Sequence, residues 1–228
     1  MFETKKDKSW LDRFQDKHPV LYSFGDLLLN ILIIIFLVFT VRTYLISPFQ
    51  VSGPSMCDTL NQIKGTCQDS FGEYLIVNKA VYRYSTPERG DIIVFRPPHN
   101  TEDFYIKRIV GLPGETVKLQ NGKVYISNKE HQSGYELPEK YLNKNNKNQT
   151  LPHSAQLVTT YEVPQGMYFV MGDNRKKSTD SRTCFRGIGD RDCNNSVNNF
   201  LPISNIEGKA WMVLWPFNKI RVLQDPAY

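Results

Sequence analysis

One long apolar run and several short ones set the pattern of the chain. Residues 27–41 are leucine, isoleucine, valine and phenylalanine except for one asparagine and one threonine, and none is charged. With Lys17 and Arg42 extending their charged ends toward lipid headgroups, the predicted helix covers residues 23–46. A helix needs about 20 residues to cross a bilayer core of ~30 Å. The run therefore predicts one transmembrane helix.

A cleaved signal peptide and a buried core helix fit the apolar run less well. A cleaved signal peptide has a short basic flank and ends at an Ala-x-Ala-like site. Here the flank is long, and residues 47–50 (SPFQ) offer no such site. A buried core helix that is apolar on all sides needs more surrounding protein than the rest of the chain supplies. The preferred interpretation is a retained membrane anchor.

After residue 49, short β-rich segments alternate with turn signals. Asn121-Gly122 between two such segments is a strong hairpin signal, and Pro97-Pro98 ends another segment. The sequence contains no long amphipathic helix and no internal repeat. The pattern predicts a mostly β fold built from antiparallel sheet. The expected strands cover residues 74–79, 91–95, 105–110, 117–119, 123–126, 167–171 and 210–214.

The domain organisation follows from these elements. Residues 129–150 are polar and rich in asparagine and lysine, which is typical of a solvated loop. With the preceding hairpin they form a predicted insertion, a small β and loop subdomain over residues 118–165. We expect a cytoplasmic segment at 1–22, the transmembrane helix at 23–46, and an extracytoplasmic domain at 47–228 that contains the insertion.

Charge supports this orientation. Lysine and arginine before a span keep that end in the cytoplasm, and acidic residues contribute little to the rule. The net charge of +5 is modest and the basic residues are scattered among acids. This indicates no nucleic-acid-binding face, and it suits weak attraction to anionic lipid headgroups. A single-pass protein of the cytoplasmic membrane is expected. The basic residues before the span are Lys5, Lys6, Lys8, Arg13 and Lys17.

All four cysteines follow the span, in two close pairs. Three pairings are possible, and an exported domain meets oxidising conditions in which such pairs form disulfides. The local bridges Cys57–Cys67 and Cys184–Cys193 are favoured. A zinc site is the alternative, but both spacings are far wider than C-x₂₋₄-C. No metal or cofactor is therefore expected.

Two short segments carry the candidate chemistry. In residues 51–56 (VSGPSM), Ser55 lies in a Gly/Pro turn that leaves backbone N–H groups free to stabilise an oxyanion. In residues 104–110 (FYIKRIV), Lys107 shares a strand face with apolar neighbours while Arg108 points the other way. A serine nucleophile needs a base, and lysine serves only if burial lowers its pKa from ~10.4 to ~7–8. Taken alone, Ser55 also fits an ordinary loop serine, and Lys107 also fits a lysine that reaches water from an edge strand. Together they indicate a serine/lysine hydrolase.

A third segment, residues 172–182 (GDNRKKSTDSR), follows a predicted strand. It is dense in side chains that hydrogen-bond the backbone or each other. A solvated charged loop is the simpler interpretation of this segment taken by itself. Asp180 and Arg182 at its end are also suited to a buried ion pair.

These segments, with one more, resemble bacterial type I signal peptidase, a membrane-bound Ser/Lys endopeptidase. The matching blocks occur in family order after the N-terminal anchor, and the similarity covers nearly the whole chain from the span onward. The blocks are residues 51–60 (VSGPSMCDTL), 89–95 (RGDIIVF), 105–115 (YIKRIVGLPGE), 172–182 (GDNRKKSTDSR) and, near the end, 208–210 (GKA).

The resemblance implies a role for each matching residue. Ser55 would be the nucleophile and Lys107 the general base, with the Ser55 backbone N–H donating to the oxyanion. Ser178 would orient the Lys107 amine, and Asp180 would pair with Arg182 to support the site. The substrate would be the signal peptide of an exported preprotein, bound as an added strand with small residues one and three positions before the cut. No histidine, metal or cofactor would take part.

The chain departs from the family pattern in three places. Gly53 stands where some members carry a serine whose hydroxyl adds a second oxyanion donor. Asp58 stands where the family usually has proline. After Arg182, where an aromatic residue and a glycine are common, residues 183–187 lead into an insertion around Cys193.

Three alternatives remain open at this point. A related Ser/Lys processing peptidase with a narrower substrate range is one. Self-cleaving LexA-like repressors also use serine and lysine, but they are cytosolic and carry a DNA-binding domain, whereas this chain has an anchor. An inactive membrane-tethered β module that binds exported chains belongs to another class. The intact Ser55, Lys107, Ser178 and Asp180 argue against that module.

Overall fold

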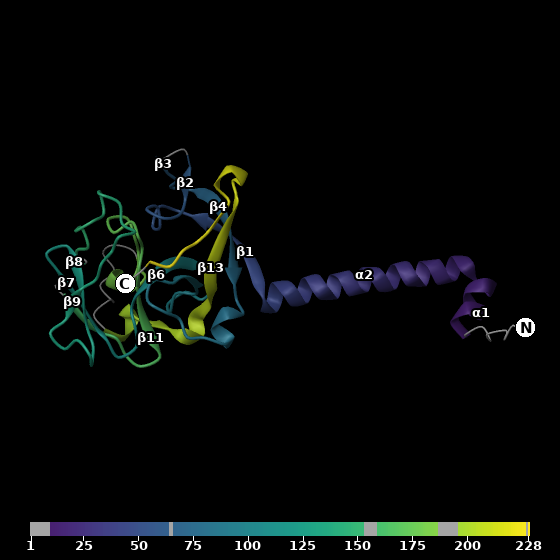
Figure 1. Ribbon diagram of the computed structural model, residues 1–228, viewed down its shortest axis with the longest axis horizontal. Coiled ribbons are helices and arrows are strands. Elements are labelled where there is room, and N and C mark those ends of the chain that lie inside the picture. The colour runs from purple at the N-terminus through teal and green to yellow at the C-terminus, as the bar shows by residue number, and fades with distance from the viewer. Residues whose placement is uncertain (1–9, 64–65, 153–158, 187–195, 227) are drawn as a thin grey trace, which may run out of the picture. The chain divides into compact units, whose positions relative to one another are not determined.

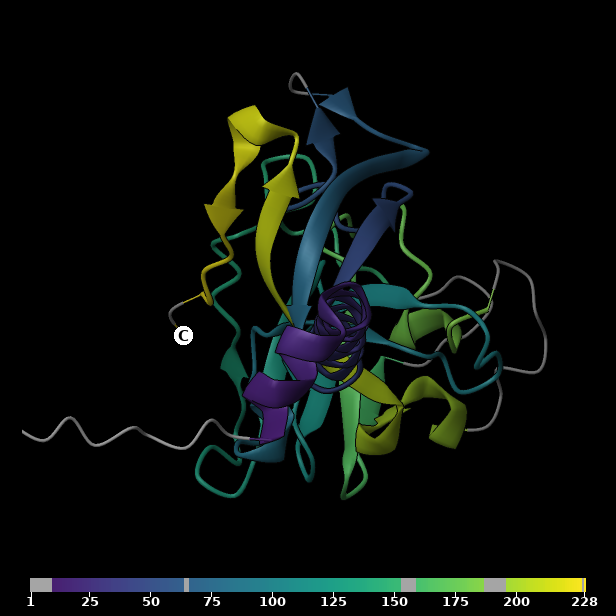
Figure 2. The same cartoon turned by 90° about the vertical axis from the view of Figure 1, so that its right-hand side faces the viewer.

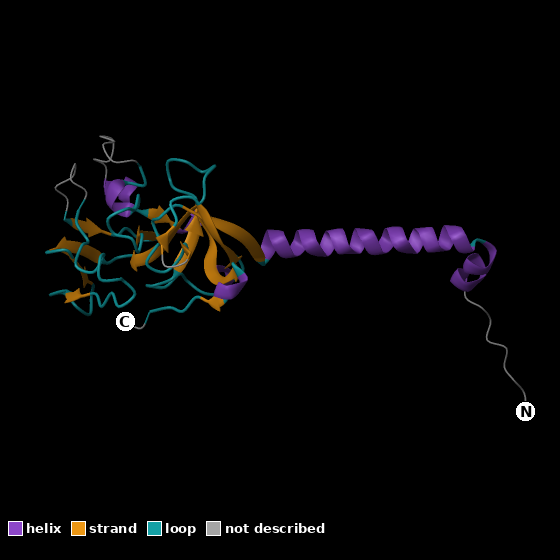
Figure 3. Cartoon of the chain, turned by 90° about the horizontal axis from the view of Figure 1, so that it is seen from above, coloured by secondary structure: helices purple, strands orange, loops and turns teal. Residues whose placement is uncertain are grey.

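The chain divides into two compact units, Met1–Leu45 and Ile46–Tyr228. The first unit is helical, and the second holds the strands (Figure 3). The structure is a computed structural model, and it describes residues 10–63, 66–152, 159–186, 196–226 and 228.

The helical unit consists of α1 (Trp10–Lys17) and α2 (Pro19–Tyr44). Pro19 lies in the first turn of α2, where its missing N–H removes no helical hydrogen bond, so α2 begins before the predicted residue 23. The 26 residues of α2 rise about 39 Å. Among the described residues, α2 alone is long and apolar enough to cross a membrane.

The main sheet has eight antiparallel strands in the described part of the chain. Seven follow the order β1-β4-β13-β5-β6-β11-β12, and β14 pairs with β13 (Figure 1). Figure 2 shows β1, β4 and β13 side by side. The strands are β1 (Ile46–Ser52), β4 (Phe71–Asn78), β5 (Ile92–Phe95), β6 (Tyr105–Gly111), β11 (Met167–Met171), β12 (Leu201–Pro202), β13 (Ile206–Trp215) and β14 (Arg221–Val222).

A second antiparallel sheet, in the order β10-β7-β8-β9, occupies the range predicted as an insertion. Asn121 and Gly122 join β7 to β8 with φ of 52° and 76°, the left-handed backbone that a two-residue hairpin requires. A two-stranded sheet, β2 with β3, follows the serine turn. These strands are β7 (Thr116–Gln120), β8 (Lys123–Ser127), β9 (Tyr135–Glu136), β10 (Thr160–Glu162), β2 (Gln62–Ile63) and β3 (Thr66–Cys67). The 3₁₀ helices are η1 (Val81–Arg83), η2 (Ser181–Thr183), η3 (Ser196–Asn199), η4 (Ile203–Asn205) and η5 (Phe217–Lys219).

Apolar packing fixes the two sheets and the serine turn. Phe169 of β11 packs in one cluster with Val117 of β7, so the two sheets share a core. Met56 and Leu60, just after Ser55, are fully buried in a cluster with Leu75 of β4. Burying a side chain of this size contributes about 1.5–3 kcal/mol. The backbone that follows the serine is thus held by the core.

The observed architecture confirms the predicted fold class, antiparallel β sheet preceded by one apolar helix. All seven expected strands are present, most with ends shifted by one to a few residues. Strand β1 was not predicted, because Pro48 cannot donate a ladder hydrogen bond. It is tolerated because β1 lies at the edge of the sheet.

Candidate active site

Ser55 lies in the turn that follows β1. Gly53 has φ of 81°, a conformation that favours glycine, and its N–H donates to Ser70 O at 3.2 Å. Cys57 N–H then donates to Pro54 O at 3.1 Å, which closes the turn around Ser55. The Cys57–Cys67 disulfide, predicted from the sequence, links this turn to β3. The serine is therefore presented by a braced loop.

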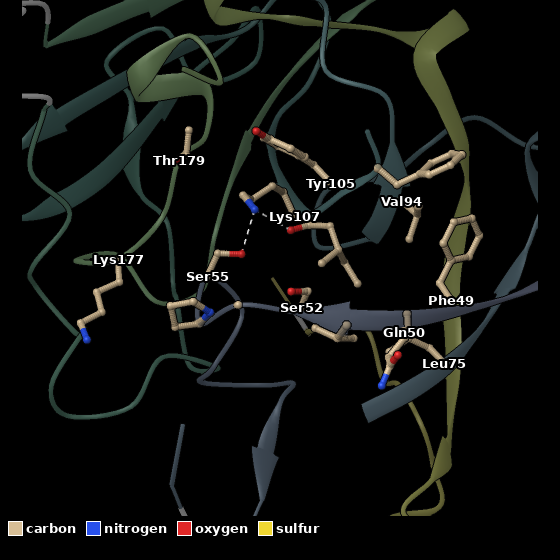
Figure 4. Close-up of a pocket in the computed structure, with 15 residues that line it drawn as sticks. Phe49, Gln50, Ser52, Ser55, Leu75, Val94, Tyr105, Lys107, Lys177 and Thr179 are labelled. Carbon is tan, nitrogen blue, oxygen red and sulfur yellow. Dashed lines mark hydrogen bonds between the residues drawn. The ribbon is translucent and has the colours of Figure 1, made fainter. Parts of the chain in front are cut away.

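Lys107 comes to the same point from the middle of β6. Its Nζ and Ser55 Oγ are hydrogen-bonded at 2.9 Å, and Nζ also donates to Ile106 O at 2.9 Å (Figure 4). The residue is 4% exposed. Burial lowers the pKa of Lys107 to about 8, although the charges of Asp180 and Asp173 act in the opposite direction. An appreciable fraction of the amine is therefore neutral near physiological pH.

The loop after β11 holds the serine turn from the other side. Asn174 N–H donates to Ser55 O at 3.0 Å, and Asn174 Nδ2 donates to Pro54 O at 3.1 Å. A Cβ on Gly172 would lie 2.4 Å from Ser55 O, so only glycine permits this approach. Within the described residues the Ser55 N–H makes no hydrogen bond. A backbone donor is thus available beside the hydroxyl.

Asp180 and Arg182 form a buried ion pair. Arg182 Nη2 lies 2.8 Å from Asp180 Oδ2, and Arg182 Nε lies 2.9 Å from Oδ1. Burial raises the pKa of Asp180, but the charge of Arg182 and the hydrogen bonds to the carboxylate together outweigh burial and leave the pKa below its ordinary value. Asp180 Oδ2 also accepts from Gly172 N–H at 3.1 Å. The ionised carboxylate thereby fixes the start of the loop that reaches Ser55.

Ser178 lies beside Gly172, whose added Cβ would be 2.2 Å from Ser178 Oγ. This hydroxyl is buried and makes no hydrogen bond of ordinary geometry among the described residues. Its proximity to the Asp180 carboxylate helps to lower the pKa of that group. The hydrogen bond from Ser178 to the Lys107 amine that the resemblance implies is not formed in this structure.

Arg108 and Asp173 form a second buried pair, which the sequence did not predict. Arg108 points away from Lys107, as strand alternation predicts, and its Nη2 lies 2.7 Å from Asp173 Oδ2. Thr59 Oγ1 donates to the same carboxylate oxygen at 2.5 Å. The pair thus connects β6, the loop after β11 and the segment following Ser55. The alternation gave the direction of Arg108, but no local signal identified a partner 65 residues away.

Asp58, which replaces the usual proline, joins the serine turn to the asparagine-rich loop. Its carboxylate accepts from Asn143 N–H at 2.8 Å, Asn143 Nδ2 at 2.7 Å and Asn146 Nδ2 at 2.8 Å. Burial raises the pKa of Asp58, against the effect of these hydrogen bonds. The other expected bridge, Cys184–Cys193, involves a residue outside the described part of the chain, and it stays a prediction.

A first cavity, of about 390 Å³, lies over Ser55 and Lys107 between β1 and β6. Figure 4 shows its lining, with Leu75, Val94 and Phe49 to one side of the serine. This first cavity combines a serine hydroxyl and a buried lysine amine with an apolar wall. That wall consists of Phe49, Val51, Leu75, Val94, Phe104 and Ile106.

Comparison with known proteins identifies the family. The sequence model described as signal peptidase, peptidase S26 matches residues 24–215. The chain belongs to this signal peptidase family. It is 34% identical to signal peptidase I T of Bacillus subtilis (strain 168), over 84% of this chain and 85% of that one. It is 36% identical to signal peptidase I U of the same strain, over 85% and 88%. A crystal structure of a signal peptidase I from Enterococcus faecalis V583 is 34% identical, with a TM-score of 0.38 and coverage of 55% of this chain and 97% of that one.

Family membership confirms the activity expected from the sequence. A signal peptidase I is a serine endopeptidase that removes signal peptides from secreted preproteins, and the match spans most of α2 and nearly all of the β unit. The alternative of an inactive binding module is disfavoured by this membership. The alternative of a self-cleaving repressor is disfavoured because the two Bacillus subtilis relatives are signal peptidases that match over most of their length.

Proposed function

We propose that Ser55 and Lys107 form the catalytic dyad that cleaves the signal peptide. The observation that carries this assignment is the 2.9 Å contact between Ser55 Oγ and the buried Lys107 Nζ. Neutral Lys107 accepts the proton of the Ser55 hydroxyl as Oγ bonds to the scissile carbonyl carbon. The resulting oxyanion accepts a hydrogen bond from the Ser55 N–H.

The remaining steps return the enzyme to its starting state. Protonated Lys107 gives its proton to the leaving nitrogen as the carbon–nitrogen bond breaks, which releases the mature chain and leaves the signal peptide as an ester on Ser55. Lys107 then takes a proton from water as the water oxygen bonds to the ester carbon. The carbon–Oγ bond breaks, and Oγ recovers the proton from Lys107.

Four further residues support the dyad in this proposal. Gly53 provides the left-handed turn that presents Ser55 but has no hydroxyl for a second oxyanion donor. Asp180 and Arg182 fix the loop that contacts the serine turn. Ser178 fills the space beside Gly172 and orients the Lys107 amine once substrate has displaced the Ser55 hydroxyl.

The first cavity binds the residues that precede the cut. An extended peptide adds as a strand along residues 105–107 of β6, which pair with β5 on one side and extend past the end of β11 on the other. Its side chains at positions one and three before the cut point to the same face. The apolar wall admits alanine there and excludes larger groups. The partners are therefore the signal peptides of exported preproteins, and no nucleic acid takes part.

We also propose that α2 anchors the enzyme in the cytoplasmic membrane, with the β unit on the extracytoplasmic side. The length and apolar surface of α2 support this. Trp211 and Trp215 of β13 are 46% and 44% exposed, and tryptophan is suited to the headgroup region. A site held near the bilayer surface meets the cleavage region of a signal peptide as it leaves the membrane.

Cleavage of a purified preprotein tests the proposal. The full chain in detergent is incubated with a preprotein whose signal peptide ends in Ala-x-Ala, and the products are identified by mass spectrometry. Cleavage after the second alanine is expected, with loss of activity in Ser55→Ala. A bulky residue in place of the alanine just before the cut should block processing. Equal processing of both substrates, or full activity of Ser55→Ala, would refute the proposed function.

A further inference from the structure

We propose that a second cavity beside Ser55 binds the first residues of the mature protein and favours acidic side chains there. This inference rests on the proposed function, because it takes Ser55 as the point of cleavage. The second cavity has a volume of about 290 Å³. Its walls come from the serine turn, the disulfide, the asparagine-rich loop and the loop after β11, and include Cys57, Cys67, Asn143, Asn174, Lys176 and Lys177.

The two cavities adjoin at the serine turn. Residues 53–55 line the first cavity, Cys57 and Asp58 line the second, and Lys177 lines both. In Figure 4, Lys177 lies on the opposite side of Ser55 from Phe49, and its ammonium group points away from the serine. A peptide held in the first cavity with its scissile carbonyl at Ser55 therefore continues past Lys177 into the second cavity.

The two cavities differ in chemistry. The first has an apolar wall, whereas the second is lined by amide side chains and two lysines. Lys176 and Lys177 are exposed, and within the described residues neither ammonium group makes an ion pair or a hydrogen bond. The carboxylate in the lining, Asp58, already accepts three N–H groups. The second cavity is therefore net positive and attracts acidic side chains.

Matched peptides test this preference. All share one signal-peptide half ending in Ala-x-Ala, and they carry aspartate, asparagine or lysine at a single position among the first four residues after the cut. The measured quantity is the ratio of kcat/KM for the aspartate peptide to that for the lysine peptide. At low ionic strength we expect a ratio of about 3–10 at one or more positions, falling as salt screens exposed charges. Because both rates come from one enzyme preparation, any loss of folded protein cancels.

Charge reversal assigns the effect to the cavity. Lys177→Glu and Lys176→Glu should each lower the ratio of kcat/KM. The variant at the lysine nearer the bound side chain should give a ratio below one, which means that it prefers the lysine peptide. Lys147→Glu is the matched control, since Lys147 is an exposed lysine of the asparagine-rich loop that lines a different cavity. Its ratio should equal that of the unmodified enzyme.

Three results would overturn the inference. One is a ratio of one at every position in the unmodified enzyme. Another is an equal fall in the ratio for Lys147→Glu, which would assign the preference to net charge. The third, no cleavage of any peptide after Ala-x-Ala, would overturn the proposed function and this inference with it. The first two results leave the proposed function intact, so the two failures are distinguishable.

Discussion

Burial of the Lys107 amine opposes folding while it lowers the pKa of the proposed catalytic base. The folded-state pKa is about 8 and the ordinary value is 10.5. Between these values the unfolded chain binds more protons, so stability rises with pH across that window. The destabilisation is fully present below pH 8 and is lost above the unfolded-state pKa. Activity and stability therefore make opposite demands on this one residue.

Replacing the amine by an apolar group of similar length should stabilise the protein at neutral pH. Lys107→Met removes the penalty of burying a charge but also two hydrogen bonds, so we expect the free energy of unfolding at pH 7 to rise by roughly 1–3 kcal/mol. Denaturant unfolding at pH 7 and pH 10 measures the gain, which should shrink at the higher pH. The exposed Lys144→Met is the control and should change little. A less stable Lys107→Met at pH 7 would contradict this account.

The same lowered pKa fixes the direction of the activity profile. Only the neutral amine accepts the serine proton, so kcat/KM should increase about tenfold per pH unit below pH 8 and level off above it. Lys107→Arg should be inactive at every pH, because guanidinium stays protonated. Initial rates from pH 6 to pH 10, with circular dichroism to verify folding, measure both effects. Turnover by Lys107→Arg would remove Lys107 from the base role.

At the scale of elements, the serine turn depends on a contact with the asparagine-rich loop. Asp58→Ala removes the acceptor for three N–H groups from Asn143 and Asn146. Leaving such donors unpaired should lower the free energy of unfolding by about 1–3 kcal/mol and speed hydrogen exchange in residues 143–149. The exposed Asp69→Ala is the control. Equal exchange in that loop for both variants would show that Asp58 does not hold it.

The disulfide gives a second prediction at this scale. Cys57 and Cys67 enclose a loop of ten-residue separation, and opening a loop of this size should lower the free energy of unfolding by about 2–3 kcal/mol. Denaturant unfolding of the double variant Cys57→Ser and Cys67→Ser, compared with that of the oxidised unmodified protein, measures this value. Because the bridge is two residues from Ser55, kcat should fall as well. Unchanged stability and kcat would mean that the core alone braces the turn.

The sequence predicted elements best where the signal was local. The bounds of strand Met167–Met171 were predicted to the residue. Asn121-Gly122 correctly indicated the hairpin between β7 and β8. Strand β1 was missed because a proline lies in an edge strand directly after a helix. The contact of Asp58 with Asn143 was also missed, since it spans 85 residues and the loop's composition indicated only solvation. The residues around each partner in such a long-range contact contain no pattern that identifies the other partner.

At the scale of the whole molecule, sheet pairing assembles the site. Lys107 reaches Ser55 because β6 pairs with β5 on one side and β11 on the other, and the loop after β11 contacts the serine turn. Motifs therefore gave the residues of the proposed site, but the distances between these residues depend on strand register. The unbonded Ser178 hydroxyl is an example, because the motif gave its presence and the fold sets its geometry.

The placement of the two units across a membrane is the remaining question at this scale. Basic residues before α2 favour a cytoplasmic N-terminus, and the Cys57–Cys67 disulfide requires an oxidising compartment for the β unit. These two features are independent, and both support the proposed extracytoplasmic side for the β unit. In intact protoplasts, added trypsin should therefore digest the β unit, which has exposed sites such as Lys176.

An epitope tag placed before residue 1 makes the test two-sided. In intact protoplasts the tag should survive on a fragment that includes α2, because the membrane shields the basic segment before it. After permeabilisation the tag should be lost, which verifies that it is accessible to trypsin. A cytosolic marker protein is the control for leakage. Loss of the tag from intact protoplasts while the β unit survives would reverse the orientation, and the dyad would then face the cytoplasm, where exported signal peptides are not cleaved.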